Sequence, residues 1–374
     1  MVEIKQVKTK KDIKEFIELP LKMYKDNPYF VPPLYADEKA LFKKETVYSE
    51  QAESIFFLAI KNGKTVGRIQ GILQRVSNEK WNQKRVRFTR FDSTNDQEVA
   101  NALFCAIENW AKEKGMEEVV GPLGYSDLDR EGLLIEGFEE LSTFEEQYNF
   151  PYYATLLENK GYQKEVDWVE SKIYAPDQID ERLERISSLM LKKYELRLGT
   201  AKNAREFIKK WGDGFFEVLD ETYEAIYQSV PFTPKMKKNL ISSFKLILNV
   251  KYAVVILDKE DKIVGFGLAL PSIGKALQKS GGRLTPCAII KVLKAIKHPK
   301  VIDLALVGVI PKYRNKAIAT AIFSEMQKML SNGEIEYCET NLNLETNLAI
   351  QNQWKNFKRV QHKRRRSYVK KLED

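Results

Sequence analysis

The stretch DLALVGVIPKYRNKAIATAIF, residues 303–323, contains three successive patterns. Residues 304–310 form an apolar run of strand length, and residues 316–330 carry apolar side chains at helical spacing. A basic turn with Arg314 and Lys316 lies between them. The first N–H groups of a helix have no internal partners, and they form the positive end of the helix dipole. The stretch therefore predicts a strand, a turn that can hold a phosphate, and a helix. The alternative is a structural turn without a ligand.

The chain of 374 residues contains a repeat. An apolar strand, a charged turn and a second strand occur at 56–73 and again at 252–270. The preceding NPYFVPPL, residues 27–34, matches YQSVPFTPKM, residues 227–236. Hairpins mixed with helices favour a mixed, mostly antiparallel sheet flanked by helices in each copy. The sequence therefore predicts an α+β class with two tandem copies of one fold.

We place the boundary between the copies near Pro176, which gives domains 1–176 and 177–374. The second copy carries a basic insertion at about 271–300.

The turn of the first copy that corresponds to the basic turn reads FDSTNDQEV, residues 91–99. Its acids Asp92, Asp96 and Glu98 would repel a phosphate, and Asp96 would cap the following helix. The first copy is therefore predicted to lack a phosphate-binding turn and to act as a structural or substrate-shaping partner.

The net charge of +9 is concentrated in the second half of the chain. Residues 271–300 contain seven Lys or Arg and residues 354–371 contain nine, and neither segment contains an acid. Such segments suit phosphates, nucleic acid or a membrane surface, and the alternative is a solvated loop and strand. The alternation through the last segment predicts an exposed edge strand.

The insertion contains TPCAIIKVLKAIK, residues 285–297, where Thr285 fits an N-cap and Pro286 the first helical position. This helix either packs over the sheet, covers a long acyl chain, or rests on an acidic membrane.

Zinc sites, disulfides and a catalytic triad have little support in this sequence. The three cysteines show no CxxC spacing, which indicates free, buried thiols and no metal. His298 and His362 have charged neighbours and are expected at the surface. No apolar run reaches the length of a membrane span, and the charged N-terminus lacks the core of a signal peptide. A cytoplasmic location is expected.

The strand and basic turn resemble the acyl-CoA-binding segment of the GNAT-type N-acyltransferase superfamily, whose turn reads R/Q-x-x-G-x-G/A. The matching residues here are Arg314, Asn315, Lys316, Ala317, Ile318 and Ala319. Alanines replace the glycines, but their N–H groups can still donate to a phosphate. The whole chain resembles a tandem of two such folds, and NPYFVPPL with VVGPLGYSD resembles a bacterial two-repeat subgroup. The resemblance implies acyl-CoA as co-substrate, expected to be acetyl-CoA, bound by these six residues with Val307 and Val309.

In such enzymes a carboxylate or water accepts the amine proton, and a tyrosine protonates the leaving thiolate. The corresponding tyrosine positions here are Trp354 and Leu157, which cannot act as acids. We therefore consider Glu339 as the base, on the hypothesis that burial raises its pKa. Its alternative is a carboxylate paired with Lys or Arg. Asn341 shares a strand face with Glu339, and Tyr227 lies in the region that shapes the amine site in relatives.

The sequence thus favours an N-acyltransferase that transfers an acyl group from acyl-CoA to an amine-bearing small molecule or peptide. One alternative is a non-catalytic protein that binds acyl-CoA or a partner in the same cleft. Another is binding of nucleic acid or a membrane surface by the basic second half.

Overall fold

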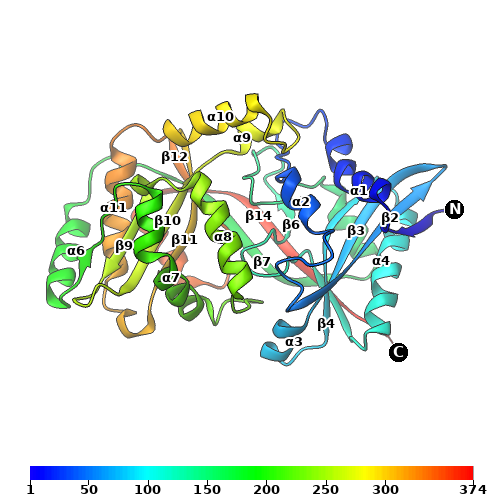
Figure 1. Ribbon diagram of the computed structural model, residues 1–374, viewed down its shortest axis with the longest axis horizontal. Coiled ribbons are helices and arrows are strands. Elements are labelled where there is room, and N and C mark those ends of the chain that lie inside the picture. Colours follow the sequence, from blue (N-terminus) through cyan, green and yellow to red (C-terminus); the bar gives the residue numbers. More distant parts are fainter. Residues whose placement is uncertain (374) are drawn as a thin grey trace.

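A computed structural model describes residues 1–373 and shows two similar halves built on one sheet (Figure 1). The first half contains β1 (Glu3–Gln6), α1 (Lys10–Met23), α2 (Tyr35–Ala40), β2 (Ala52–Lys61), β3 (Lys64–Gln74), α3 (Arg75–Trp81), β4 (Arg85–Ser93), α4 (Gln97–Glu113), β5 (Glu118–Gly121), β6 (Leu133–Glu136), α5 (Tyr152–Asn159) and β7 (Gln163–Tyr174). The second half contains α6 (Glu181–Lys193), β8 (Arg197–Leu198), α7 (Ala204–Tyr223), α8 (Pro234–Ile247), η1 (Val250–Tyr252), β9 (Ala253–Leu257), β10 (Ile263–Pro271), α9 (Gly274–Gln278), α10 (Pro286–Lys297), β11 (Val301–Val309), η2 (Pro311–Tyr313), α11 (Ala319–Ser331), β12 (Tyr337–Thr340), β13 (Asn343–Leu344), α12 (Leu348–Gln353), η3 (Trp354–Asn356) and β14 (Lys358–Lys371).

The strands are ordered β1-β2-β3-β4-β5-β14-β7-β12-β11-β10-β9-β8, with β6 and β13 paired off this path. The pairs β4–β5 and β11–β12 are parallel, and the other pairs are antiparallel. Both predicted hairpins are present, as β2–β3 and β9–β10. The predicted mixed, mostly antiparallel sheet is confirmed.

The halves exchange their last strands. β14 lies between β5 and β7 of the first half, and β7 lies between β14 and β12. Figure 1 shows β14 crossing the middle of the molecule beside β7. Each half-sheet is therefore completed by a strand from the other half.

The prediction that the basic tail forms an exposed edge strand is wrong, because β14 is hydrogen-bonded on both sides. The side chains of Lys363 and Arg365 are 0% exposed and paired with acids, and Arg365 Nε lies 2.6 Å from a Glu170 oxygen. His362, expected at the surface, has a side chain that is only 4% exposed. A strand flanked by acids on its neighbours can hold this much positive charge inside a protein.

The duplicated Val-Pro loops also cross between the halves. Gln278 of the second half donates hydrogen bonds of 2.8 and 3.0 Å to two carbonyls of loop 27–34. Gln51 of the first half donates a hydrogen bond of 2.7 Å to Pro231 O, in loop 227–236. Each of the two repeated loops therefore accepts hydrogen bonds from a glutamine of the other half.

Helices cover both faces of each half-sheet. In the second half, α7, α8 and α10 pack on one face of β10, and α6 and α11 pack on the other. Glycine permits the close approach of α11, since a Cβ on Gly267 would lie 2.4 Å from Ile322. The expected helix start at Thr285 and Pro286 is confirmed for α10.

Two predictions about cysteine and histidine exposure are tested directly. Cys338 is buried, but Cys105 and Cys287 are exposed, so the expectation of buried thiols holds for one of the three. His298 is exposed as expected.

Across residues 1–373, no helix combines the length and apolar character that crossing a bilayer requires.

Candidate active site

The basic turn of the second half leaves several N–H groups free. α11 has no side-chain cap, and in the described part of the chain no hydrogen bond uses the N–H groups of Asn315, Ala317, Ile318 or Ala319. Ile318 is 1% exposed and anchors the turn in the core. These donors lie at a helix N-terminus, which is a suitable place for a phosphate.

The turn reaches its shape by left-handed backbone conformations. Asn315 has a φ of 60° and Ala317 a φ of 54°. Ala317 therefore adopts the conformation for which the glycine of the related motif is suited, at the cost of some strain. Ala317 can therefore occupy this position with the same backbone conformation that a glycine would adopt.

Positive side chains surround the turn. Arg314 donates hydrogen bonds of 3.3 Å to the carbonyl oxygens of Val309 and Thr222, which ties the turn to α7. Lys316 Nζ lies 5.3 Å from the centre of the Tyr194 ring. Neither Arg314 nor Lys316 has an acidic partner within residues 1–373, so their charge is available to an anion.

The corresponding corner of the first half is satisfied internally. Asp96 caps α4 by accepting a hydrogen bond from Glu98 N at 3.0 Å, and Lys61 lies 2.5 Å from Asp96 and 2.8 Å from Glu98. The cap uses a donor that a phosphate would need, and both acids repel anions. That the first half lacks a phosphate-binding turn stays a prediction.

The parallel strands β11 and β12 separate near the middle of β11. Their pairing covers residues 301–304 and 337–340, and it ends at the hydrogen bond of 3.2 Å from Asn341 N to Leu304 O. Beyond it, the Tyr223 hydroxyl lies 3.4 Å from both the N and the O of Val307. The free edge of β11 is thus bordered by a hydroxyl from α7. The Val307 and Val309 side chains pack toward α6 and α11, so these residues would bind a ligand through their backbone.

Asp303 is a buried acid that the sequence reasoning missed. It is 5% exposed, it lies beside Glu339 in the β11–β12 pair, and its carboxylate makes no well-formed hydrogen bond in the described residues. Burial, followed by repulsion from Glu339 and Glu145, raises its pKa well above the usual value. The available signal was an acid interrupting the apolar strand VIDLALVGV. A buried carboxyl group with a raised pKa is a candidate for proton exchange with a bound substrate.

Glu339 has the opposite environment. Burial alone would raise its pKa, but the Lys363 ammonium and His362 outweigh burial and lower the pKa to about 2. The expectation of a raised pKa is therefore wrong, and the ion pair considered as its alternative is present. Lys363 Nζ also lies 3.5 Å from Glu170, so Glu339 belongs to a buried ion-pair network.

The structure separates the other two predicted catalytic residues. The side-chain oxygen of Asn341 accepts a hydrogen bond of 2.9 Å from Leu342 N, at the point where β11 and β12 part. Tyr227 lies on the sheet of the first half, where it donates to Glu165 at 3.2 Å and packs edge-on against Trp168. Tyr223, four residues earlier at the end of α7, is the tyrosine that reaches β11.

Other carboxylates with raised pKa values lie near these groups. Burial raises the pKa of Glu145 to about 7 and that of Asp127 to about 6. Glu145 acts electrostatically on Asp303, and Asp127 acts on Tyr223. These carboxyl groups can exchange protons or hydrogen bonds with an amine bound beside them.

An apolar groove opens on the same face of the sheet as Asp303. It lies between α7, α8 and β10 and is lined mainly by phenylalanine and aliphatic side chains, among them Phe215, Phe244 and Leu268. Leu268 and Leu270 point to one face of β10, and Asp303 stands directly opposite Leu270. The groove and Asp303 thus share one face of the sheet.

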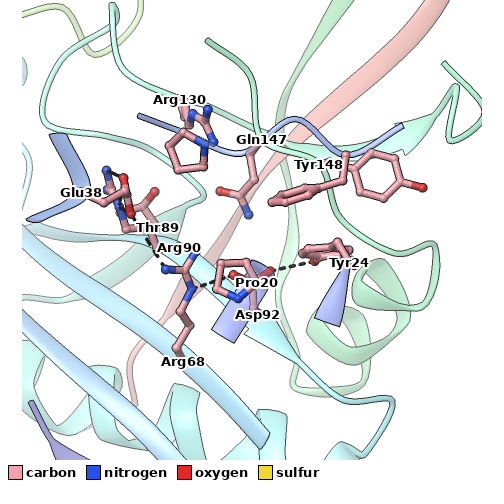
Figure 2. Close-up of a pocket in the computed structure, with 12 residues that line it drawn as sticks. Pro20, Tyr24, Glu38, Arg68, Thr89, Arg90, Asp92, Arg130, Gln147 and Tyr148 are labelled. Carbon is pink, nitrogen blue, oxygen red and sulfur yellow. Dashed lines mark hydrogen bonds and ion pairs between the residues drawn. The ribbon is translucent and has the colours of Figure 1, made fainter. Parts of the chain in front are cut away.

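The comparable pocket of the first half is lined by ion pairs, as Figure 2 shows. Arg68 Nε lies 2.7 Å from Asp92, and Arg90 donates to both carboxylate oxygens of Glu38. The residue aligned with Arg68 in the second copy is Phe266, within the apolar core. The two copies have therefore diverged, because charged side chains line this pocket of the first half and apolar side chains line the groove of the second.

The chain has the tandem fold of GNAT-type acyltransferases. A tandem GNAT protein from the clavulanic acid biosynthesis pathway superposes with a TM-score of 0.57 at 11% identity, covering 100% of this chain and 99% of that one. A GCN5-related N-acetyltransferase from Sphaerobacter thermophilus gives a TM-score of 0.51 at 11% identity, covering 100% and 96%.

Two curated proteins are distant homologues. Protein YghO of Escherichia coli is 25% identical over 97% of this chain and 94% of its own length. The bacterial ceramide synthase of Caulobacter vibrioides is 25% identical over 82% of this chain and 80% of its own length. No family model matches the sequence.

Proposed function

We propose that the protein transfers an acyl group from acyl-CoA to the amino group of an acceptor, at a site in the second half. The observation that carries this proposal is the set of free N–H groups at residues 315 and 317–319, whose counterpart in the first half is capped. These donors hold the CoA diphosphate, assisted by Arg314 and Lys316. The pantetheine arm follows the free edge of β11 and brings the thioester toward Tyr223 and Asp303.

In the reaction the amine nitrogen attacks the thioester carbon, so that a C–N bond forms and the C–S bond breaks. Asp303 accepts the proton that the amine loses. A cationic amine bound beside Asp303 lowers the pKa of that carboxyl by charge attraction, so a reactive carboxylate is present before transfer. The bound ammonium gives its first proton to Asp303, and this frees the nitrogen lone pair for the attack. After the C–N bond has formed, the second N–H proton passes to the departing sulfur, which leaves as CoA thiol while Tyr223 donates a hydrogen bond to it.

The acceptor class follows from the groove and from the distant relative. An apolar groove beside the acidic site suits an amine that carries an alkyl chain. One distant homologue is named bacterial ceramide synthase, and a ceramide is the N-acyl derivative of a long-chain amine. We therefore propose a long-chain amine as acceptor. The length of the transferred acyl group, predicted from the sequence to be acetyl, is tested by comparing acetyl-CoA with longer acyl-CoAs.

Calorimetric titration with CoA, acetyl-CoA and longer acyl-CoAs tests the donor site. Binding by the wild type that is lost in Arg314→Glu supports it, and Lys259→Glu, on an exposed turn, is the matched charge control. Release of CoA thiol, followed with short-chain and long-chain amines, tests the transfer step. An absence of CoA binding in the wild type would refute the proposal.

The non-catalytic alternative is favoured by one observation. Trp354 occupies the position of the usual acid, and its indole N–H donates to Asn343 at 2.7 Å, which makes it a structural residue. Acyl-CoA binding without thiol release across the amine panel would select this alternative.

A further inference from the structure

The helix α10 is apolar on both sides. Its inner side packs into the core of the second half, where Ala288 and Val292 are each 3% exposed. Its outer side exposes Ile289 by 42%, Ile290 by 67% and Leu293 by 52%. A solvated helix of a globular protein has polar residues at such positions, so the outer side requires a different explanation.

Lysines border this outer side. Residues 271–300 contain no acid, and of their seven basic side chains Arg283 is paired, 2.8 Å from Glu18. The other six are exposed and have no ion-pair partner within residues 1–373: Lys275, Lys279, Lys291, Lys294, Lys297 and Lys300. Exposed aliphatic residues surrounded by unpaired lysines are the signature of a helix that lies in the interface of an anionic bilayer.

We propose that the outer side of α10 docks the protein on an anionic lipid surface. The exposed aliphatic side chains enter the interfacial region, and the lysines contact the anionic headgroups. Nucleic acid is disfavoured as the occupant, because the exposed groups are aliphatic and lysine, without the aromatic residues or unpaired arginines that stack on bases. The combination of charge and apolar surface thus selects lipid.

The helix that carries the docking surface is hydrogen-bonded to the segment that follows one wall of the apolar groove. Asn249, just after α8, donates a hydrogen bond of 3.3 Å to Ile296 O near the end of α10, and α8 forms one wall of the groove. In Figure 1, α10 runs along one edge of the molecule, next to the region of α8 and β10. This inference rests on the proposed function for its purpose, since a docked enzyme can take a long-chain amine from the membrane.

Co-sedimentation of the full chain with vesicles tests the proposal. We expect binding to vesicles of equal parts phosphatidylcholine and phosphatidylglycerol, weak binding to phosphatidylcholine alone, and loss of binding at high salt. The double variant Lys291→Glu/Lys294→Glu should bind at least on the order of thirty-fold more weakly. Its matched control is Lys64→Glu/Lys259→Glu, which changes the net charge equally on exposed hairpin turns and should bind like the wild type.

The apolar contribution is tested by Ile290→Ser/Leu293→Ser, which should weaken binding to the anionic vesicles and leave circular dichroism and thermal unfolding unchanged. Failure of the wild type to bind anionic vesicles, or an equal loss in the control variant, would overturn the proposal. It would also be overturned if α10 were covered by a second copy, seen as a dimer that Ile290→Ser/Leu293→Ser dissociates, or by DNA that the same variants release. CoA binding and thiol release with a water-soluble amine, measured without vesicles, report separately on the proposed function.

Discussion

Asp303 of β11 and Glu339 of β12 are direct neighbours in the parallel strand pair, but only Glu339 has cationic partners. Lys363 and His362 hold Glu339 ionised, with a pKa of about 2, whereas burial and repulsion raise the pKa of Asp303. The two carboxyl groups are therefore suited to different roles. Asp303 holds a proton more tightly than an ordinary carboxyl, and Glu339 neutralises a buried lysine.

We expect Asp303→Asn to lower kcat about 10²- to 10⁴-fold with little change in CoA affinity, because the amide cannot accept the amine proton. Glu339→Gln should instead destabilise the fold by about 3–5 kcal/mol, because it leaves the Lys363 charge buried and poorly compensated. Thiol-release kinetics and urea unfolding measure the two effects. The opposite result, with kcat lost only in Glu339→Gln, would assign the base to Glu339 as the sequence predicted.

Two tyrosines of one sequence stretch provide a matched pair. Tyr223→Phe should reduce kcat more than it changes KM, because its hydroxyl is placed to assist the leaving thiolate. Tyr227→Phe should leave kcat nearly unchanged and cost about 1 kcal/mol of stability through the lost hydrogen bond to Glu165. Steady-state kinetics of both variants decide between them, and a larger kcat loss in Tyr227→Phe would contradict this assignment.

Ala317→Gly should stabilise the protein, by about 1 kcal/mol or less, because it relieves a left-handed alanine at φ 54°. Binding of CoA should be retained or tighter. The control Ala319→Gly lies at the first position of α11 and should destabilise by about 0.5–1 kcal/mol, because it adds chain entropy without relieving strain. Thermal unfolding of both variants, with and without CoA, tests the expected difference in sign.

Glu145 should make stability depend on pH. Burial raises its folded-state pKa to about 7, above the unfolded value of about 4.3, so the folded state binds the proton more tightly. Its contribution to stability is therefore fully present below about pH 4 and is lost as the pH rises through 7. Glu145→Gln should remove this loss and raise stability at pH 8 by on the order of 1–2 kcal/mol, with no gain at pH 4. Denaturant unfolding at both pH values measures it, and an equal effect at both would exclude titration as the cause.

The duplicated fold could be predicted from sequence because it rests on local patterns. The hairpins at 56–73 and 252–270 and the cap at Thr285 depend on residues close together in the chain. The proton acceptor depends on partners far apart. Asp303 and Glu339 lie in similar strands, and their difference arises from Lys363 on β14, which the sequence assigned to an exposed edge. The exchange of strands between the halves depends on contacts between residues far apart in the sequence, so no local sequence pattern predicts it.

The exchange of β7 and β14 predicts that the first half cannot fold without the C-terminal strand. A chain of residues 1–176 would leave β5 and β7 without their shared neighbour, and it would leave Glu170 buried without Arg365, which now lies 2.6 Å away. We expect this fragment to aggregate or to show no cooperative thermal transition. The same fragment joined by a flexible linker to residues 354–371 should recover a cooperative transition, because the tail supplies both the hydrogen bonds and the cations. If residues 1–176 folded independently, the first half would be a complete domain without the C-terminal strand. The full chain would then unfold in two separable steps.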